Sequence, residues 1–107
     1  MSLEVKKISD ENLRSAERLK EVFLSPKYRV STMVYDPGTQ FSGSTRSGIV
    51  YVHSGSCKIR TSKGSIFIDE GHYLEFPEGD FDLKVVSKVN LCITNVWNVE
   101  KLIEENT

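Results

Sequence analysis

The segment Gly71-His-Tyr-Leu-Glu-Phe-Pro77-Glu-Gly79-Asp-Phe-Asp82 contains a short strand pattern followed by a tight turn. Residues 72–76 show the two-residue period of a strand, and residues 77–80 have the composition of a loop. Proline ends strand pairing because it lacks a backbone N–H, and glycine permits the sharp turn that follows. A second strand pattern covers residues 81–86. The segment therefore predicts two consecutive strands joined by a short loop.

The two-residue period continues on both sides of this segment. Turn residues such as Asp36-Pro37-Gly38 separate the apolar runs at intervals typical of small sandwiches and barrels. The polar stretch 39–48 is predicted to be a loop. On residues 49–52 both faces are apolar, so this strand is predicted to be covered on both sides, with His53 facing away from the barrel interior. Five further strands are predicted at residues 28–35, 49–52, 57–61, 65–69 and 91–97.

One amphipathic helix is predicted at residues 10–24, before the first long strand. Leu13, Ala16 and Phe23 recur at helical spacing, Ser9 is a candidate N-cap and Pro26 ends the pattern. A short final helix is predicted at residues 99–106. We expect one domain, with residues 1–27 forming a helical arm that packs on a barrel of residues 28–107.

The composition excludes several classes of function. Fourteen basic residues balance 15 acidic residues among the 107, giving a net charge of −1. No basic surface for nucleic acid and no membrane-spanning run is visible, so we expect neither partner. Two cysteines form no disulfide framework and no Cys-x-x-Cys pair, which favours a cytoplasmic location.

The spacing of Gly71, Pro77 and Gly79 resembles the second sequence motif of the cupin superfamily. That motif is a glycine, five residues, Pro-x-Gly, two residues and a metal-binding histidine. Upstream, residues 36–38 and 49–55 are similar to the edges of the first cupin motif. The resemblance covers about residues 30–97, most of the chain. It implies an all-β, cupin-like double-stranded β-helix, a small β-barrel or jelly roll, with an N-terminal helix and a short C-terminal helix.

The metal-ligand positions implied by the resemblance carry other residues. Ser42 and Ser44 fall near the His-x-His pair, Gly48 takes the place of the glutamate, and Asp82 takes the place of the last histidine. We therefore expect no metal and no other cofactor. The orientation of Asp82 is left open: alternation with the apolar Phe81 turns it outward, whereas the family pattern turns it inward.

Several polar and aromatic residues are candidates for contact with a ligand. Arg46 lies in a Gly/Ser-rich stretch of the kind that binds a carboxylate or sugar phosphate. Tyr35 and Phe41 flank a turn, and His72 is expected at the barrel mouth near Asp82, as a potential general base. The candidate ligand-binding residues are Tyr35, Phe41, Ser42, Ser44, Arg46, His72 and Asp82.

These observations favour a metal-free, non-catalytic domain, with no catalytic residue assigned. It would bind a small polar or sugar-like ligand or act as a dimeric interaction module. Two alternatives stay open: a metal-independent enzyme similar to sugar epimerases or isomerases of the superfamily, and a divalent-metal cupin with a non-standard site. By analogy with cupin-like chains that pair through their sheets, we also predict a homodimer.

Overall fold

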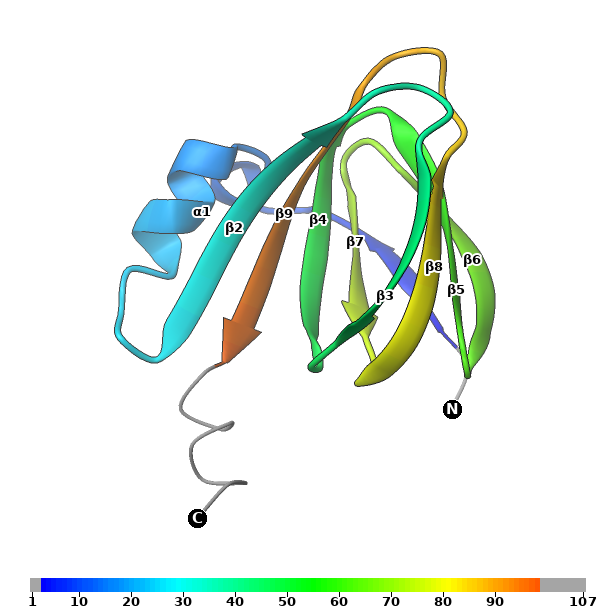
Figure 1. Cartoon of the computed structure of the whole chain (residues 1–107). Helices are drawn as coiled ribbons and strands as arrows, with labels where there is room; N and C mark the ends of the chain where they lie inside the picture. Colours follow the sequence, from blue (N-terminus) through cyan, green and yellow to red (C-terminus); the bar gives the residue numbers. More distant parts are fainter. Residues whose placement is uncertain (1–2, 99–107) are drawn as a thin grey trace.

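The computed structural model describes residues 3–98 and contains two facing antiparallel sheets with one short α-helix outside them (Figure 1). One sheet has five strands in the order β1-β7-β4-β9-β2, and the other has four in the order β3-β8-β5-β6. This arrangement confirms the predicted all-β class. The strands are β1 (Val5–Lys7), β2 (Tyr28–Tyr35), β3 (Gln40–Thr45), β4 (Gly48–Ser54), β5 (Ser56–Thr61), β6 (Gly64–Asp69), β7 (His72–Phe76), β8 (Gly79–Val85) and β9 (Leu91–Asn98).

The main core lies between the two sheets. Strand alternation sends every second side chain of each central strand inward, for example Val50 and Val52 on β4 and Leu83 and Val85 on β8. These side chains are almost completely buried. Cys57 belongs to the same core, and burial followed by the nearby charge of Asp69 raises the pKa of its thiol to about 12. This thiol is therefore a structural residue with little thiolate character.

Strands β2 and β7 have the predicted boundaries, whereas the predicted loop 39–48 is wrong. Most of that segment forms β3, which pairs antiparallel with β8 along its whole length. Its small polar residues mask the pattern, because Ser42 and Ser44 face outward and meet the carboxylates of Asp82 and Asp80. β8 begins earlier than predicted for the same reason. This segment has the composition of a loop, but it forms a strand because it pairs with β8.

The predicted helix 10–24 is also shorter than expected. A 3-10 turn, η1 (Glu11–Leu13), precedes α1 (Ala16–Val22). Ser15 has an extended backbone and accepts a hydrogen bond from the N–H of Arg18, so Ser15 and not Ser9 is the N-cap. The break lets Leu13 and Phe23 reach the same sheet face. The strand β1 was not predicted, because three residues are too few to show a period.

The N-terminal arm covers the outer face of the five-stranded sheet (Figure 1). Ile8 and Leu19 are buried there against Tyr51 and Val96. Strand β4 is consequently covered on both faces, as predicted from its apolar residues. The final predicted helix, residues 99–106, lies outside the described residues. Among residues 3–98, no helix is long and apolar enough to cross a membrane.

A hydrogen-bonded chain of polar groups joins the arm to this sheet. His53 faces outward, as predicted, and its Nδ1 lies 2.8 Å from the backbone oxygen of Arg14. A carbonyl only accepts, so Nδ1 carries a proton. The other nitrogen, Nε2, lies 2.7 Å from the Thr94 hydroxyl, which in turn lies 3.0 Å from the Thr32 hydroxyl. In the neutral ring, Thr94 donates to Nε2 and Thr32 donates to Thr94.

The burial of His53 makes the folded protein sensitive to acid. Desolvation lowers the pKa of the imidazole below its usual 6.5, although the Arg14 carbonyl partly opposes this effect. As the pH falls, His53 is therefore protonated in the unfolded chain before it is protonated in the folded protein. Its contribution to the free energy of unfolding is fully present above about pH 6.5 and is lost as the pH drops from there towards the folded pKa. Thermal unfolding followed against pH should show this loss, and His53→Gln should flatten the curve. His72→Gln is the matched control, and an equal acid slope in His53→Gln and the wild type would contradict the assignment.

Candidate functional site

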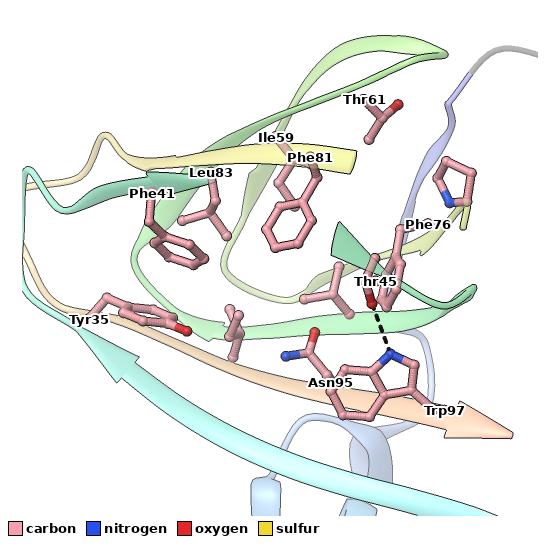
Figure 2. A pocket seen from close by; sticks show the side chains of 13 residues that line it. Tyr35, Phe41, Thr45, Ile59, Thr61, Phe76, Phe81, Leu83, Asn95 and Trp97 are labelled. Atoms are coloured by element: carbon pink, nitrogen blue, oxygen red, sulfur yellow. Dashed lines mark hydrogen bonds between the residues drawn. The ribbon is translucent and has the colours of Figure 1, made fainter. Parts of the chain in front are cut away.

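A cavity of about 100 Å³ lies between the two sheets. It reaches the end of the barrel at which β3, β5 and β7 terminate, with Thr45, Thr61 and Phe76 bordering it there. Figure 2 shows its walls converging from both sheets. The lining residues, most of them apolar, are Tyr35, Phe41, Thr45, Val50, Ile59, Thr61, Phe76, Pro77, Phe81, Leu83, Ile93, Asn95 and Trp97.

Aromatic rings form much of the wall because they stand at inward positions of the strands. Phe41 is the link between three of them: its ring centroid lies 5.0 Å from that of Tyr35 and 6.0 Å from that of Phe81. The second pair is edge-to-face, an arrangement that aromatic quadrupoles favour. Gly43, on the same inner face, leaves room for the Phe81 ring, since a β-carbon there would lie 3.3 Å from it. The wall is therefore a packed and largely rigid aromatic surface.

Four polar side chains interrupt the apolar wall. Two of them are engaged within the protein: Thr45 accepts a hydrogen bond of 3.2 Å from the Trp97 indole, and Thr61 accepts one of 3.0 Å from the Lys63 N–H. For Asn95 and Tyr35, no side-chain hydrogen bond to another described residue is present. Burial raises the pKa of the Tyr35 hydroxyl, which therefore stays protonated as a donor at neutral pH.

Asn95 projects into the cavity between Tyr35 and Trp97 (Figure 2). It stands on β9 at an inward position, in alternation with Ile93 and Trp97, whereas Thr94 and Val96 face the arm. An amide offers both donors and acceptors, so Asn95 presents unused hydrogen-bonding capacity to an otherwise apolar space. In a strand that is covered on both faces, a polar residue in the inward series is a sequence signal for such a site, although Asn95 was not among the predicted residues.

The candidate residues predicted from sequence are divided among several places. Tyr35 and Phe41 line the cavity. Arg46 lies in the turn between β3 and β4 and forms an exposed ion pair with Glu78, with Nη1 2.8 Å from Oε1. The cavity residues that were not candidates for ligand contact include Thr45, Thr61 and Asn95.

Ser42, Ser44 and Asp82 lie on the outside of the four-stranded sheet. Asp82 accepts hydrogen bonds from Ser42 and from the Arg60 Nε, the latter at 2.9 Å. The Ser42 hydroxyl and the Arg60 guanidinium lower the pKa of this carboxyl. The structure thus decides the open orientation of Asp82: it faces outward, as the apolar alternation indicated. None of the three lines the cavity between the sheets.

The expectation that His72 lies near Asp82 is wrong. His72 begins β7 at the opposite end of the barrel, where its Nδ1 donates to the Glu70 carbonyl at 3.1 Å, and it lines a different cavity from Asp82. The end of β7 that reaches the cavity between the sheets is the one that carries Phe76, whereas His72 lies at the other end of the strand. Local alternation placed His72 and Phe76 on one face but could not indicate which end of the strand borders the cavity.

The residues at the expected cupin metal positions do not fit a metal ion. Ser42, Ser44 and Asp82 face away from the barrel interior. At Gly48, a β-carbon would lie 2.6 Å from the Val96 oxygen and 2.9 Å from the Phe76 and Trp97 rings. Within the described part of the chain, no three His, Cys, Asp or Glu side chains are grouped so that they could hold a metal.

The comparisons with known proteins identify the fold. No family model matches the chain, and no curated protein sequence matches it. Among solved structures, the Cupin_2 domain of an XRE family transcriptional regulator from Enterobacter cloacae superposes with a TM-score of 0.59 at 14% identity, over 90% of this chain and 95% of that chain. A DUF861 family protein from Thermotoga maritima gives 0.58 at 18% identity, over 91% and 99%.

A salicylate 1,2-dioxygenase from Pseudoaminobacter salicylatoxidans also matches, with a TM-score of 0.61 at 12% identity over 76% of this chain. The match spans only 24% of the length of the dioxygenase. Together these structures confirm that the chain has the cupin β-barrel fold. At such identities the likeness concerns the fold and carries no chemistry with it.

Substitution of Gly48 should destabilise the protein, because this position is in contact with the two rings that border the cavity. We expect Gly48→Ala to lower the free energy of unfolding by about 1–3 kcal/mol, the usual result of overpacking. Urea unfolding would measure the change, with exposed Ser47→Ala as the neighbouring control. A Gly48→Ala protein as stable as the wild type would show that the Val96 backbone as well as the Phe76 and Trp97 rings shifts without cost.

Proposed function

We propose that this cupin-fold chain is a binding module whose cavity takes a small, neutral, mainly apolar molecule with one or two hydrogen-bonding groups. The observation that carries the proposal is the Asn95 amide, which projects into an aromatic-lined space without an intramolecular partner among the described residues (Figure 2). A polar group held in an apolar cavity weakens packing, and this is typical of residues retained for binding.

The shape and lining of the cavity limit the ligand. Apolar cavities of about 150 Å³ accept a molecule the size of benzene, so this cavity of about 100 Å³ is too small to enclose a whole ring. Because it reaches the end of the barrel, we expect it to hold a single ring such as benzene or phenol with part of the ring outside, or a shorter chain entirely. A sugar, which we expected from sequence, fits these walls poorly, because most of its hydroxyl groups would lose water without gaining a partner. No charged side chain of the described residues lines the cavity, so a neutral ligand is favoured.

The geometry gives less support to the isomerase alternative. An isomerase needs a general base within hydrogen-bond reach of its substrate, and neither His53 nor His72 lines the cavity. Tyr35 is the one titratable side chain among the lining residues, and its raised pKa makes it a donor, not a base. Binding without turnover is therefore the function that this arrangement supports best.

Replacement of Asn95 should weaken ligand binding without destabilising the fold. With phenol and benzene as probes, ligand-observed NMR should show tighter binding of phenol to the wild type. Asn95→Leu should remove this preference, by a factor of up to about ten for the loss of one buried hydrogen bond. The same variant should unfold at a higher temperature, since leucine fills the apolar space.

Ser42→Ala, on the outer face of the sheet, is the matched control and should leave both probes unaffected. A phenol preference that survives in Asn95→Leu would place the polar contact elsewhere. Failure of both probes to bind the wild type would overturn the binding function itself.

We also propose that two copies pair through β2, in accord with the expected homodimer. This strand is eight residues long and forms one edge of the five-stranded sheet. It exposes Met33 and Val34, which are 41% and 60% accessible. Long apolar edge strands are prone to pair with another strand, and an antiparallel pair is compatible with a two-fold axis.

A lysine on β2 should disrupt this pairing. Light scattering coupled to size-exclusion chromatography should give a dimer for the wild type and a monomer for Val34→Lys, since both copies bring the charge to one interface. Val89→Lys is the control, because Val89 is 59% exposed in the loop before β9. A monomeric wild type at micromolar concentration would refute the dimer.

A further inference from the structure

A second cavity, of about 340 Å³, lies where β4 ends and β7 begins. It is bordered by Lys7 on β1, Arg14 in the arm, His53 on β4 and the segment 70–72. This is the end of the barrel opposite the Arg46–Glu78 ion pair, and the cavity shares no lining residue with the aromatic cavity. The cationic side chains of Lys7 and Arg14 and the imidazoles of His53 and His72 thus line this cavity from separate elements of the fold.

Three of these groups keep unused hydrogen-bonding capacity. Arg14 is fixed by its Nε and Nη2, which lie 3.2 and 2.9 Å from the Ile8 oxygen, so its Nη1 is available. His72 donates from Nδ1 to the Glu70 carbonyl, so Nε2 of the neutral ring is a free acceptor, suited to the P–OH group of a protonated phosphate. No side-chain bond of Lys7 to another described residue is present, and its ammonium carries three donors.

His53 has a different role in this cavity. Both of its nitrogens are engaged, by the Arg14 carbonyl and the Thr94 hydroxyl, so it supports Arg14 and offers no free donor. Arg14 is thereby held at two points: its guanidinium is bonded to Ile8 and its backbone to His53. A guanidinium that is fixed in this way loses little freedom when it binds an anion.

The charges around the cavity favour an anion. Lys7 and Arg14 are both positive, and Glu70 is the single carboxylate among the lining residues. The side chains that line this cavity therefore carry a net positive charge even when both histidines are neutral. Donors from Lys7 and Arg14 together with the His72 acceptor suit a tetrahedral anion that carries both oxyanion oxygens and a hydroxyl group better than a planar carboxylate, which is best held by one guanidinium fork.

We propose that Lys7, Arg14 and His72 form a binding site for a phosphate-type oxyanion, either free phosphate or a phosphate ester. The site is independent of the aromatic cavity. It also couples the arm to the barrel, because its ligand would contact β1, the arm and β7 at once.

The test is an NMR titration of the whole protein with inorganic phosphate at neutral pH and constant ionic strength. Saturable shifts of the amide signals of Lys7, Gly71 and His72 are expected. Lys7→Gln and His72→Gln should each raise the dissociation constant, by about tenfold for the lost cationic contact of Lys7. Neither variant removes a contact that holds the arm, so both should stay folded. Methyl phosphate, titrated in parallel, distinguishes an ester site from one that needs the free anion.

Lys63→Gln provides the matched control. It changes the net charge as Lys7→Gln does, but it lies in the turn between β5 and β6 at the other end of the barrel. If Lys63→Gln weakened phosphate binding as much as Lys7→Gln does, the binding would reflect only the overall charge of the protein, and the proposed site would be wrong. The proposal would also fail if no shift saturated with either phosphate, or if acetate bound as tightly as phosphate.

Discussion

The antiparallel register of β3 against β8 determines the character of both faces of the four-stranded sheet. Phe41 lies opposite Leu83 and Gly43 opposite Phe81, so these positions face the interior. Ser42 lies opposite Asp82 and Ser44 opposite Asp80, and these pairs bond on the outside. A shift of one residue would exchange the two sets and bury two carboxylates. The register therefore supplies the aromatic wall and removes the acidic groups from the interior.

The inner faces of the other sheet complete the cavity without adding charge. Val50 and Ile93 continue the apolar core, and beyond them Asn95 and Trp97 lie at the end where the sheets diverge. Most of this surface is ordinary packing, which a domain of this size needs for stability. Asn95 departs from that rule, and Tyr35 contributes a second free polar group. These two polar groups in an otherwise apolar wall are the basis for proposing a binding function and not acid–base chemistry.

The two ends of the barrel differ in chemistry because different segments close them. At one end, the turns after β3 and β7 meet through the exposed Arg46–Glu78 pair, above a neutral cavity. At the other end, β1 and the arm bring Lys7 and Arg14 beside the two histidines. The cupin fold itself prescribes neither arrangement. Each depends on side chains that this chain places at strand ends.

The sequence by itself determined the features that depend on local periodicity and turn chemistry. These include the boundaries of β2 and β7, the coverage of β4 on both faces and the outward direction of His53. Alternation fixes the face of a side chain, and proline and glycine fix where a strand turns, so each can be derived from neighbouring residues alone.

Tertiary structure decided the features that depend on which segments pair. The Gly/Ser-rich segment became β3 only because β8 supplies its partner, and the helix begins at Ala16, after the Ser15 N-cap, where the chain packs on the sheet. His72 and Asp82 are ten positions apart in the chain, but they lie on different sheets and line different cavities. Pairing between distant strands leaves no periodic trace in the sequence. The alternation of β9 therefore marks Asn95 as a polar residue in an inward series, but only the folded chain shows which aromatic rings surround it.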